Sequence, residues 1–507
     1  MQAQVAVIGG GPVGMLIAAE LAGLGADTLV LEARAEVSER PKATTLHARA
    51  VQCLARRGYL PEGTRQGATG AFHFAGIPGL VVTVPEGEPE PILKCPQADL
   101  ERLFEERARA VGARILREHR VTRVSEEPDG MRIDAEGPDG PVVVHTGFLV
   151  GADGARSTVR EQLGITSDSS PATVSALVGV VRLDDGDVLE PGWLRTPRGW
   201  VVSKRTTGGD THIRTLDCSG PYEGREQAPT LEELRREVSR IVGRNVPMAQ
   251  PRWISRFSDF TRLARTFRAG RTFLVGDAAH LHFPIGGQGL STGVLDALNL
   301  GWKLALAVRG AAGADLLHSY ERERRPAAQQ VIDNTRAQLA LMRQGPEAEA
   351  LRWVFTGLLA ADRETRQLSD MISAQGTVLP AYTACPSPHE GRFLSNTPLG
   401  MERGGADVIT LLGDGRPLLL LSGGQAARYE EVARPWSDLL HVVHAPGAPG
   451  LPDEALLVRP DGYIGWSTGG GPLVEALSRY FGEDERGRDD SQAEDSSAAC
   501  ANLTASA

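Results

Sequence analysis

The sequence contains very little lysine and has no cluster of basic residues. Among its 507 residues, only four of the 54 basic side chains are lysines: Lys42, Lys94, Lys204 and Lys303. The formal net charge at pH 7 is -10. A protein that binds nucleic acid must neutralise phosphates with a basic face. The acidic balance and the lack of a basic block therefore argue against a nucleic-acid partner.

Cysteines are few and apolar runs are short. The five cysteines lie far apart, without a CxxC pair or any zinc-ligand spacing. No stretch reaches the roughly 18 uncharged apolar residues that cross a bilayer. The first residues also lack the basic and long apolar segments of a signal peptide. We therefore expect a cytoplasmic protein in a reducing compartment, with no membrane contact.

A glycine-rich turn stands near the start of the chain. Residues 5–8 read as a buried strand, and residues 15–24 have the apolar spacing of a helix. Between them Gly9, Gly11 and Gly14 form GxGxxG, and a second strand, 28–31, ends at Glu32. In this setting the backbone approaches a pyrophosphate at the helix N-terminus, and the acidic residue accepts hydrogen bonds from a ribose. A plain strand-to-helix turn is the alternative, and the motif leaves NAD and FAD equally open.

Two further motifs follow in the chain. The apolar run 148–150 leads into GADGARSTVR at 151–160, and the run 272–275 leads into Gly276 and Asp277. A loop with the sequence PIGGQGLSTG at 284–293 then opens a helix. In this order the three motifs resemble those of the group A flavin monooxygenases, the superfamily of the para-hydroxybenzoate and phenol hydroxylases.

The resemblance implies that FAD is the cofactor and lies along these motifs. Glycines in the 286–289 loop would let backbone lie against the flat ring, and the helix starting near Leu290 would direct its positive end at the flavin. The chain departs from many relatives at Ser291, where they have Asn. The residues expected to bind FAD are Gly9, Gly11, Pro12, Val13, Gly14, Glu32, Ala33, Arg34, Arg40, Lys42, Gln97, Val121, Asp153, Gly154, Gly276, Asp277, Pro284, Gly286, Gly287, Gly289, Leu290 and Ser291.

Two of these carboxylates have structural alternatives. Asp277 matches the family carboxylate that holds the ribityl chain, but a turn carboxylate at a strand end would look the same. The motif of Asp153 could mainly brace the loop near the pyrophosphate. His280 and His282 form an HxH pattern, but no third ligand at suitable spacing accompanies it. No metal site is expected.

Short strands rich in Val, Thr and Arg occupy two stretches between these motifs and predict an antiparallel sheet. In the family such a sheet covers the substrate pocket. Candidate lining residues are Phe72, Phe74, Trp200 and Phe283, for which core packing is the alternative. The resemblance places Arg40, Lys42 and Arg49 near flavin, substrate or NAD(P)H, and Arg49 is the one candidate catalytic residue. The sequence identifies no other catalytic acid or base.

The second half of the chain predicts helices followed by a small α/β unit. Residues 311–380 read as helical, with the charged run 320–326 ending one segment as an exposed face. Strands are expected at 408–412, 417–421 and 440–443, then a hairpin at 455–466 and a helix at 472–481. The LVRPDGYIGW run resembles the thioredoxin-like domain of the aromatic polyketide hydroxylase branch. It lacks CxxC, so packing or oligomerisation, such as a homodimer, is the expected role.

These patterns predict an α/β fold with a Rossmann-like FAD-binding domain, an interleaved antiparallel substrate domain and a thioredoxin-like C-terminal domain. The expected boundaries are 1–70, 98–171 and 266–392 for the FAD domain with its helical extension, 71–97 and 172–265 for the substrate domain, 393–482 for the thioredoxin-like domain, and 483–507 for a disordered acidic tail.

The predicted activity is that of a monooxygenase that uses FAD, NAD(P)H and O2. It would hydroxylate a small polycyclic aromatic molecule of polyketide type through a flavin C4a-hydroperoxide, with NAD(P)H binding only transiently because no second dinucleotide motif follows. Baeyer–Villiger insertion or epoxidation of the same substrate class stays open. A flavoprotein that binds and shields an intermediate without turnover is the alternative from another class.

Overall fold

The computed structural model describes residues 1–40, 42–60, 69–183, 189–206, 208–218, 220, 227–361, 365–399, 406–446, 448 and 450–483. The predicted tail at 484–507 lies outside the described residues. The helices are α1 (Pro12–Gly23), α2 (Ala48–Arg56), α3 (Gln97–Ala110), α4 (Thr158–Gln162), α5 (Leu231–Val242), α6 (Gly289–Val308), α7 (Leu316–Met342), α8 (Pro346–Ala360), α9 (Thr365–Ile372), α10 (Val408–Leu411), α11 (Ala426–Ala433) and α12 (Leu473–Phe481).

A mostly parallel sheet forms the centre of the molecule. Its path is β18 (Arg268–Ala269), β19 (Thr272–Leu274), β10 (Gly140–Gly151), β1 (Gln2–Ile8), β2 (Thr28–Leu31) and β7 (Arg114–Leu116), parallel from β19 to β7. The antiparallel strands β8 (Arg120–Glu127) and β9 (Gly130–Gly137) extend from β10. Because β1 lies between two parallel neighbours, its second half is buried, as its apolar run predicts.

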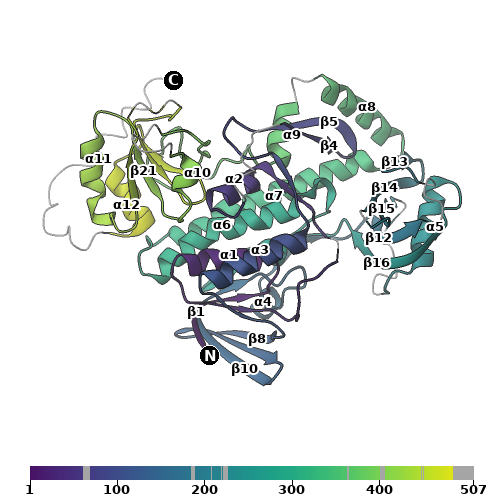
Figure 1. Ribbon diagram of the computed structural model, residues 1–507, viewed down its shortest axis with the longest axis horizontal. Coiled ribbons are helices and arrows are strands. Elements are labelled where there is room, and N and C mark those ends of the chain that lie inside the picture. Colours follow the sequence, from purple (N-terminus) through teal and green to yellow (C-terminus); the bar gives the residue numbers. More distant parts are fainter. Residues whose placement is uncertain are drawn as a thin grey trace.

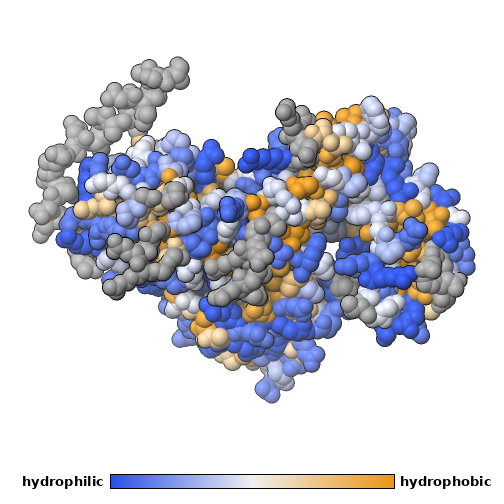
Figure 2. All heavy atoms as spheres, turned by 45° about the horizontal axis from the view of Figure 1, so that its top comes forward, coloured by the Kyte–Doolittle hydropathy of each residue, from blue (hydrophilic) through white to orange (hydrophobic). Residues whose placement is uncertain are grey.

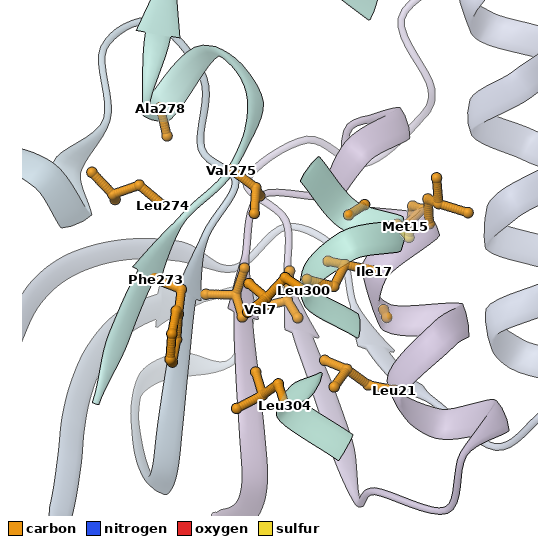
Figure 3. Packing of buried hydrophobic residues seen from close by; sticks show 14 of the residues in the cluster. Val7, Met15, Ile17, Leu21, Phe273, Leu274, Val275, Ala278, Leu300 and Leu304 are labelled. Atoms are coloured by element: carbon orange, nitrogen blue, oxygen red, sulfur yellow. The ribbon is translucent and has the colours of Figure 1, made fainter. Parts of the chain in front are cut away.

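Helices α1 and α6 cover this sheet with apolar side chains. Figure 3 shows Val7 of β1 next to Leu300 of α6 and Ile17 of α1, with Phe273 of β19 to the left and Leu21 of α1 lower right. These side chains are almost completely buried. The carboxyl ends of β1, β10 and β19 consequently open at the same edge of the sheet, where the three predicted motifs meet.

A separate antiparallel sheet lies at the right of Figure 1, with α5 packed on it. Its order is β13 (Gly192–Thr196), β14 (Gly199–Arg205), β15 (Thr211–Leu216), β12 (Ser175–Leu183) and β16 (Met248–Ser258). The strands β4 (Thr69–Phe74) and β5 (Ile77–Thr83) pair only with each other in the described part of the chain. Smaller sheets join β3 (Thr45–His47) to β6 (Ile92–Lys94), and β11 (Ser167–Ser170) through β17 (Thr261–Ala264) to β20 (His280–Leu281).

Helix α7 overturns one prediction. The charged run 320–326 was expected to end a helix as an exposed face, but it lies within α7, with Pro326 inside the helix. Glu323 and Arg324 are only 4% and 3% exposed. Proline costs a helix interior about 3 kcal/mol, so propensity predicted a break there. The buried ion pairs of Glu323 and Arg324, described below, fix this turn of the helix instead.

The C-terminal domain, at the left of Figure 1, is built on the sheet β22 (His441–His444), β21 (Leu418–Leu421), β23 (Ala455–Val458) and β24 (Ile464–Ser467). The predicted hairpin and final helix are present as β23, β24 and α12. The strand expected at 408–412 is wrong, because this segment forms the short helix α10. Asp407 caps it by accepting a 2.8 Å hydrogen bond from the Thr410 N–H, which outweighs the strand propensity of the run.

Together these sheets confirm the predicted fold class: an α/β core, an antiparallel second sheet and a C-terminal α/β domain. Among the described helices, none combines the length and the apolar composition that a membrane span requires.

Candidate active site

The turn between β1 and α1 has the close backbone contacts that its glycines predict. Gly9 has φ +103°, and a Cβ at Gly14 would lie 1.9 Å from the Gly9 carbonyl oxygen. A Cβ at Gly11, by contrast, would meet no protein atom within 4 Å. Gly11 is the N-cap of α1 and has no side chain with which to cap the helix N–H groups. The open space and the uncapped helix N-terminus therefore fit a bound phosphate.

The Val13 side chain, in the first motif, lies close to two glycines of the third motif. A Cβ at Gly293 would approach Val13 Cγ2 to 2.6 Å, and a Cβ at Gly276 would approach the same methyl group to 3.3 Å. Glycine is thus required where α1, the turn after β19 and α6 converge. The structure therefore places Pro12, Val13 and Gly276 of the predicted set at one place.

Glu32 directly follows β2, and its carboxylate is hydrogen-bonded to the glycine turn. Its Oε2 accepts a 2.6 Å hydrogen bond from the Gly10 N–H, and its Oε1 accepts a 2.8 Å bond from the Arg34 N–H. Each carboxylate oxygen retains a second lone pair for another donor. The side chain is partly exposed, and the position fits a ribose hydroxyl next to the glycine turn.

We expect Glu32→Ala to weaken FAD binding about tenfold while the protein still folds, because one acceptor of the ribose and a brace of the Gly10 turn disappear together. Fluorescence titration of the apoprotein with FAD measures the effect. Glu32→Gln keeps an oxygen acceptor and serves as the control. An unchanged FAD affinity in Glu32→Ala would contradict a ribose contact.

Asp153 and Arg160 tie the second motif to the third. Asp153 Oδ2 accepts a 3.1 Å bond from the Val159 N–H, while its Oδ1 is buried without a partner in the described structure. Burial raises the pKa of this carboxyl. Arg160 Nη1 donates to the Ala278 carbonyl at 2.9 Å. The bracing role considered for Asp153 is therefore present in the structure, and a cofactor contact through Oδ1 stays a prediction.

Asp277 is exposed to solvent in the turn after β19. Desolvation by the surrounding protein raises the pKa of its carboxyl, against the lowering effects of His280 and Lys42. Lys42 is also exposed and has its pKa lowered by desolvation first and then by the charge of Arg34. The predicted residues Arg34, Arg40, Lys42 and Asp277 are thus electrostatic neighbours.

We expect Asp277→Ala to bind FAD about tenfold to hundredfold more weakly, since a charge-assisted hydrogen bond to a ribityl hydroxyl contributes about 1.5–3 kcal/mol. The ratio of flavin to protein absorbance after purification reports the loss. Asp277→Asn retains one acceptor, so its flavin content should lie between that of the wild type and that of Asp277→Ala. Asp277→Ala protein that purifies fully yellow would reject the ribityl contact.

Asp296 of α6 holds the turn that carries Asp277 through hydrogen bonds. Asp296 accepts bonds from the Gly276 N–H at 3.0 Å, His280 Nε2 at 2.7 Å and Arg324 Nε at 2.8 Å. His282 contacts the Phe283 carbonyl through Nδ1 at 2.9 Å. Both histidines of the HxH pattern therefore have structural partners, and the described residues contain no cluster suited to hold a metal.

The GGQG loop meets β3 at a histidine that the sequence did not single out. His47 Nε2 donates to the Gly286 carbonyl at 2.7 Å, and the His47 N–H donates to Ser291 Oγ at 3.0 Å. Burial lowers the pKa of His47 to about 4, and its Nδ1 is buried without a partner among the described residues. Gly286 and Gly287 have φ of +74° and +65°, so this loop conformation favours glycine. Ser291, where many relatives have Asn, thus holds the end of β3 through its bond with the His47 N–H.

The Arg49 side chain bonds to groups outside this loop. Its guanidinium donates to the Gln375 carbonyl at 2.8 Å and stands 3.6 Å from the centroid of the Phe393 ring. The side chain is buried between α2 and the segments that lead to the C-terminal domain. These contacts describe a packing residue and give no support to the candidate catalytic role.

The remaining predicted residues belong to several different elements. Gln97 opens α3, and its N–H donates to Ala43 O at 3.0 Å, next to Lys42. Leu290 is buried at the start of α6, and Pro284 is exposed in the loop before it. Val121, on β8, packs against the central core. Contacts of Ala33, Gly154, Gly289 and these residues with FAD stay predictions.

The four predicted substrate residues share one apolar cluster. Phe74, Trp200 and Phe283 are buried in it, and Phe72 packs at its edge. Trp200 Nε1 donates to the Met342 carbonyl at 2.7 Å, so the core-packing alternative describes this side chain. Phe72 lies with its ring centroid 5.1 Å from that of His47 in an edge-to-face contact. The cluster therefore adjoins the start of the GGQG loop, since it also contains Ile285.

Comparison with known proteins agrees with this geometry. Residues 2–335 match the model of a family described as FAD binding domain, and residues 387–484 match one described as aromatic-ring hydroxylase, C-terminal. The chain is 37% identical to the 12-dehydrotetracycline 5-monooxygenase/anhydrotetracycline 6-monooxygenase of Streptomyces rimosus subsp. rimosus, over 95% of this chain and 99% of the relative.

Two further proteins with differently named activities are similar to this chain. The structure of OxyS anhydrotetracycline hydroxylase from Streptomyces rimosus superposes with a TM-score of 0.87 at 34% identity, covering 96% of this chain and 100% of that chain. The dialkyldecalin synthase of Streptomyces rugosporus is 35% identical over 95% of this chain and 99% of its own length.

Proposed function

Because this chain belongs to the family of FAD-dependent aromatic-ring hydroxylases, we propose that it is a monooxygenase that hydroxylates a polycyclic aromatic substrate of polyketide type. The observation that carries the proposal is the similarity over nearly the whole chain to a relative named an anhydrotetracycline 6-monooxygenase. That similarity extends over the second sheet and the C-terminal domain. Two proteins that shared only a nucleotide-binding fold would not need to be similar in those parts.

FAD, when bound, supplies the redox chemistry with NAD(P)H and O2, by the oxygen-transfer route expected from the sequence. The protein's own residues position it. The α1 N-terminus at Gly11 would hold the pyrophosphate, Glu32 the ribose and Asp277 the ribityl chain. The N-terminus of α6, fixed by the bonds of His47 to Gly286 and Ser291, would face the ring. The apolar cluster around Phe72 and Phe283 would exclude water from the reacting carbon.

One relative favours a second candidate function. The dialkyldecalin synthase bears a name that states no oxygenation, although its identity to this chain is close to that of the monooxygenases. A flavoprotein that shapes a polycyclic intermediate without consuming NAD(P)H is therefore the alternative. The homodimer remains an untested expectation for either activity.

Anaerobic mixing separates the two functions. The holoenzyme is mixed with NADPH in the presence and absence of anhydrotetracycline as a probe, and flavin absorbance is followed. We expect the flavin to bleach, and faster when the probe is present. After admission of labelled O2, the product should gain one labelled oxygen on a ring carbon; insertion into a ring or an epoxide would show the Baeyer–Villiger or epoxidising alternative. A flavin that stays oxidised with NADPH and with NADH, while the probe binds, would overturn the monooxygenase proposal.

A further inference from the structure

Three buried amide side chains form a continuous line of hydrogen bonds through the GGQG loop. The Ala75 N–H donates to Gln338 Oε1 at 3.1 Å, and Gln338 Nε2 donates to Asn334 Oδ1 at 3.2 Å. Asn334 Nδ2 donates to Gln288 Oε1 at 2.9 Å, and Gln288 Nε2 donates to the Ile372 carbonyl at 3.3 Å. The line runs from the turn between β4 and β5, through α7 and the loop, to the end of α9. We call Gln288, Asn334 and Gln338 the amide bridge.

The two ends of the amide bridge fix the orientation of every amide in it. A backbone N–H can only donate, so Gln338 must turn its oxygen toward Ala75. The nitrogen of Gln338 then faces Asn334, which must accept there and donate to Gln288. The Ile372 carbonyl can only accept, so Gln288 must present its nitrogen to it. One amide alone cannot flip without placing two donors or two acceptors together, and the three side chains therefore keep a single arrangement.

The amide bridge lies where apolar side chains would serve for packing alone. Gln338 is 0% exposed, and Asn334 and Gln288 are each 3% exposed. The neighbouring Leu339 and Ile372 belong to the apolar cluster that contains the predicted substrate residues. A buried amide costs free energy unless it is hydrogen-bonded, and apolar groups of the same shape are often equally stable. The hydrogen bonds of the amide bridge instead specify how three segments lie relative to one another.

The first end of the amide bridge holds a strained turn. Ala75 has φ +53°, in the left-handed region that residues other than glycine rarely adopt. Its N–H is bonded to the amide bridge, and its carbonyl accepts a 2.9 Å bond from Arg352 Nη1 of α8. A Cβ at Gly76 would lie 2.9 Å from Trp193 Cε3 and 3.1 Å from Trp200 Cζ3. Such a conformation persists only where its surroundings over-determine it, so the turn is fixed between α7, α8 and the second sheet.

This turn belongs to the hairpin that carries two of the predicted substrate residues. Phe74 directly precedes Ala75, and Phe72 lies two residues earlier on β4. Figure 1 shows the hairpin of β4 and β5 between α8 and α9, beside the lobe of the second sheet. In Figure 2 apolar surface lies where that lobe meets the body of the molecule. A movement of the hairpin would therefore shift the aromatic side chains of the apolar cluster.

The amide bridge also holds the loop expected to contact the flavin ring. The Gln288 carbonyl accepts 2.9 Å bonds from both the N–H and the hydroxyl of Thr292, in the first turn of α6. A Cβ at Gly286 would lie 3.0 Å from Gln338 Nε2 and 3.3 Å from Ile372 Cδ1. The amide bridge therefore contacts the loop at two places, through the Gln288 side chain and at the backbone of Gly286.

We propose that the amide bridge couples the GGQG loop to the hairpin of β4 and β5, so that binding of FAD at the loop holds the hairpin in place. Asn334 and Gln338 act through Gln288 and are thus positioning residues. The substrate end of this coupling rests on the proposed function, which assigns Phe72 and Phe74 to the substrate site. Coupling is reciprocal, so a substrate that holds the hairpin should tighten the binding of FAD by the same factor.

Hydrogen exchange of the whole protein, with and without FAD, tests this coupling without any substrate. At labelling times of seconds to minutes, amide exchange reports local opening rather than global unfolding. In the wild type we expect FAD to slow exchange about tenfold in the glycine turn at residues 9–14, where it binds directly. It should also slow exchange about fivefold or more in the hairpin at residues 69–83. The glycine turn shows in every variant that FAD is bound.

Asn334→Asp interrupts the amide bridge without changing its size. An ionised carboxylate cannot donate to Gln288, so at about pH 8.5 FAD should no longer slow exchange in the hairpin. Burial raises the pKa of such a carboxyl, and its protonated form can again accept from Gln338 and donate to Gln288. The coupling should therefore return at about pH 5.5. His47 and His282, beside the loop, have pKa values lowered to about 4 and stay neutral at both pH values.

Two further variants make the result specific. Gln338→Met removes both hydrogen bonds of one amide at similar side-chain length, and should abolish the coupling at either pH. Gln329→Leu changes an amide of the same helix whose 2.9 Å bond to Asp333 Oδ1 is exposed to solvent, and should change nothing. Loss of packing alone would not recover on acidification, so recovery in Asn334→Asp identifies the hydrogen bonds as the cause.

Two results would overturn the proposal: a wild-type hairpin whose exchange FAD does not slow, or equal slowing at both pH values in Asn334→Asp. The test is separable from that of the proposed function, because it requires neither substrate nor turnover. Coupling that depends on the amide bridge, in a protein whose flavin never bleaches with reduced nicotinamide, would keep the positioning role and reject the monooxygenase.

Discussion

Gly11→Ala should leave the protein as stable as wild type but unable to retain FAD, whereas Gly14→Ala should lose both stability and cofactor. A Cβ at Gly11 meets no protein atom within 4 Å, and the backbone there, with φ -71° and ψ 178°, suits any residue. The methyl group would project into the space left for the pyrophosphate. A Cβ at Gly14 would lie 1.9 Å from a backbone oxygen, so β1 and α1 would have to separate.

We expect Gly11→Ala to weaken FAD binding at least about a hundredfold, and Gly14→Ala to lose more than about 3 kcal/mol of unfolding free energy. Urea unfolding of both apoproteins measures stability, and fluorescence titration measures FAD affinity. Gly424→Ala is the control for the methyl group alone, since Gly424 lies outside the motif, in open space and without a positive φ. If Gly11→Ala bound FAD normally, the pyrophosphate would not lie at this turn.

Arg459→Met should destabilise the protein by about 3–5 kcal/mol, the usual effect of breaking a buried ion pair. Arg459 donates to Glu323 at 2.8 and 2.9 Å and to Asp461 at 2.7 Å. Lys303 donates to the same carboxylate of Glu323 at 2.8 Å. Two cations and two carboxylates thus balance in a region closed to water, and the methionine would leave the acids with one cation.

Thermal and urea unfolding of the holoenzyme test this prediction. Arg434→Met removes an equally long cation from an exposed pair with Glu431 in the same domain, and should cost less than about 1 kcal/mol. The double variant Arg459→Met/Glu323→Gln restores charge balance and should recover part of the loss. A single variant as stable as the wild type would show that the ion pair contributes nothing to the docking of the C-terminal domain.

The sequence predicts the local parts of the site well, because those parts depend on neighbouring residues. Gly9 and Gly14 are required by the turn that their own strand and helix make. The Asp277 turn and the GGQG loop likewise follow from short motifs. The apolar runs at 5–8, 28–31, 148–150 and 272–275 predict strands, and each coincides with a strand of the central sheet.

Side chains whose partners come from distant segments could not be predicted in this way. Glu323 looked like a surface charge because its partner Arg459 lies 136 residues further along the chain. His47 reaches Gly286 across 239 residues, and no local pattern indicates that contact.

Glu323 and Arg324 are adjacent on α7, and this adjacency joins two distant parts of the molecule. Glu323 binds Arg459 of the C-terminal hairpin, while Arg324 binds Asp296, which holds the turn of Asp277. If FAD binds Asp277 as we expect, docking of the C-terminal domain and binding of FAD act on the same turn of helix. Coupling between two binding equilibria is reciprocal. By whatever factor FAD lowers the equilibrium constant for detachment of the C-terminal domain, docking of that domain should tighten the binding of FAD.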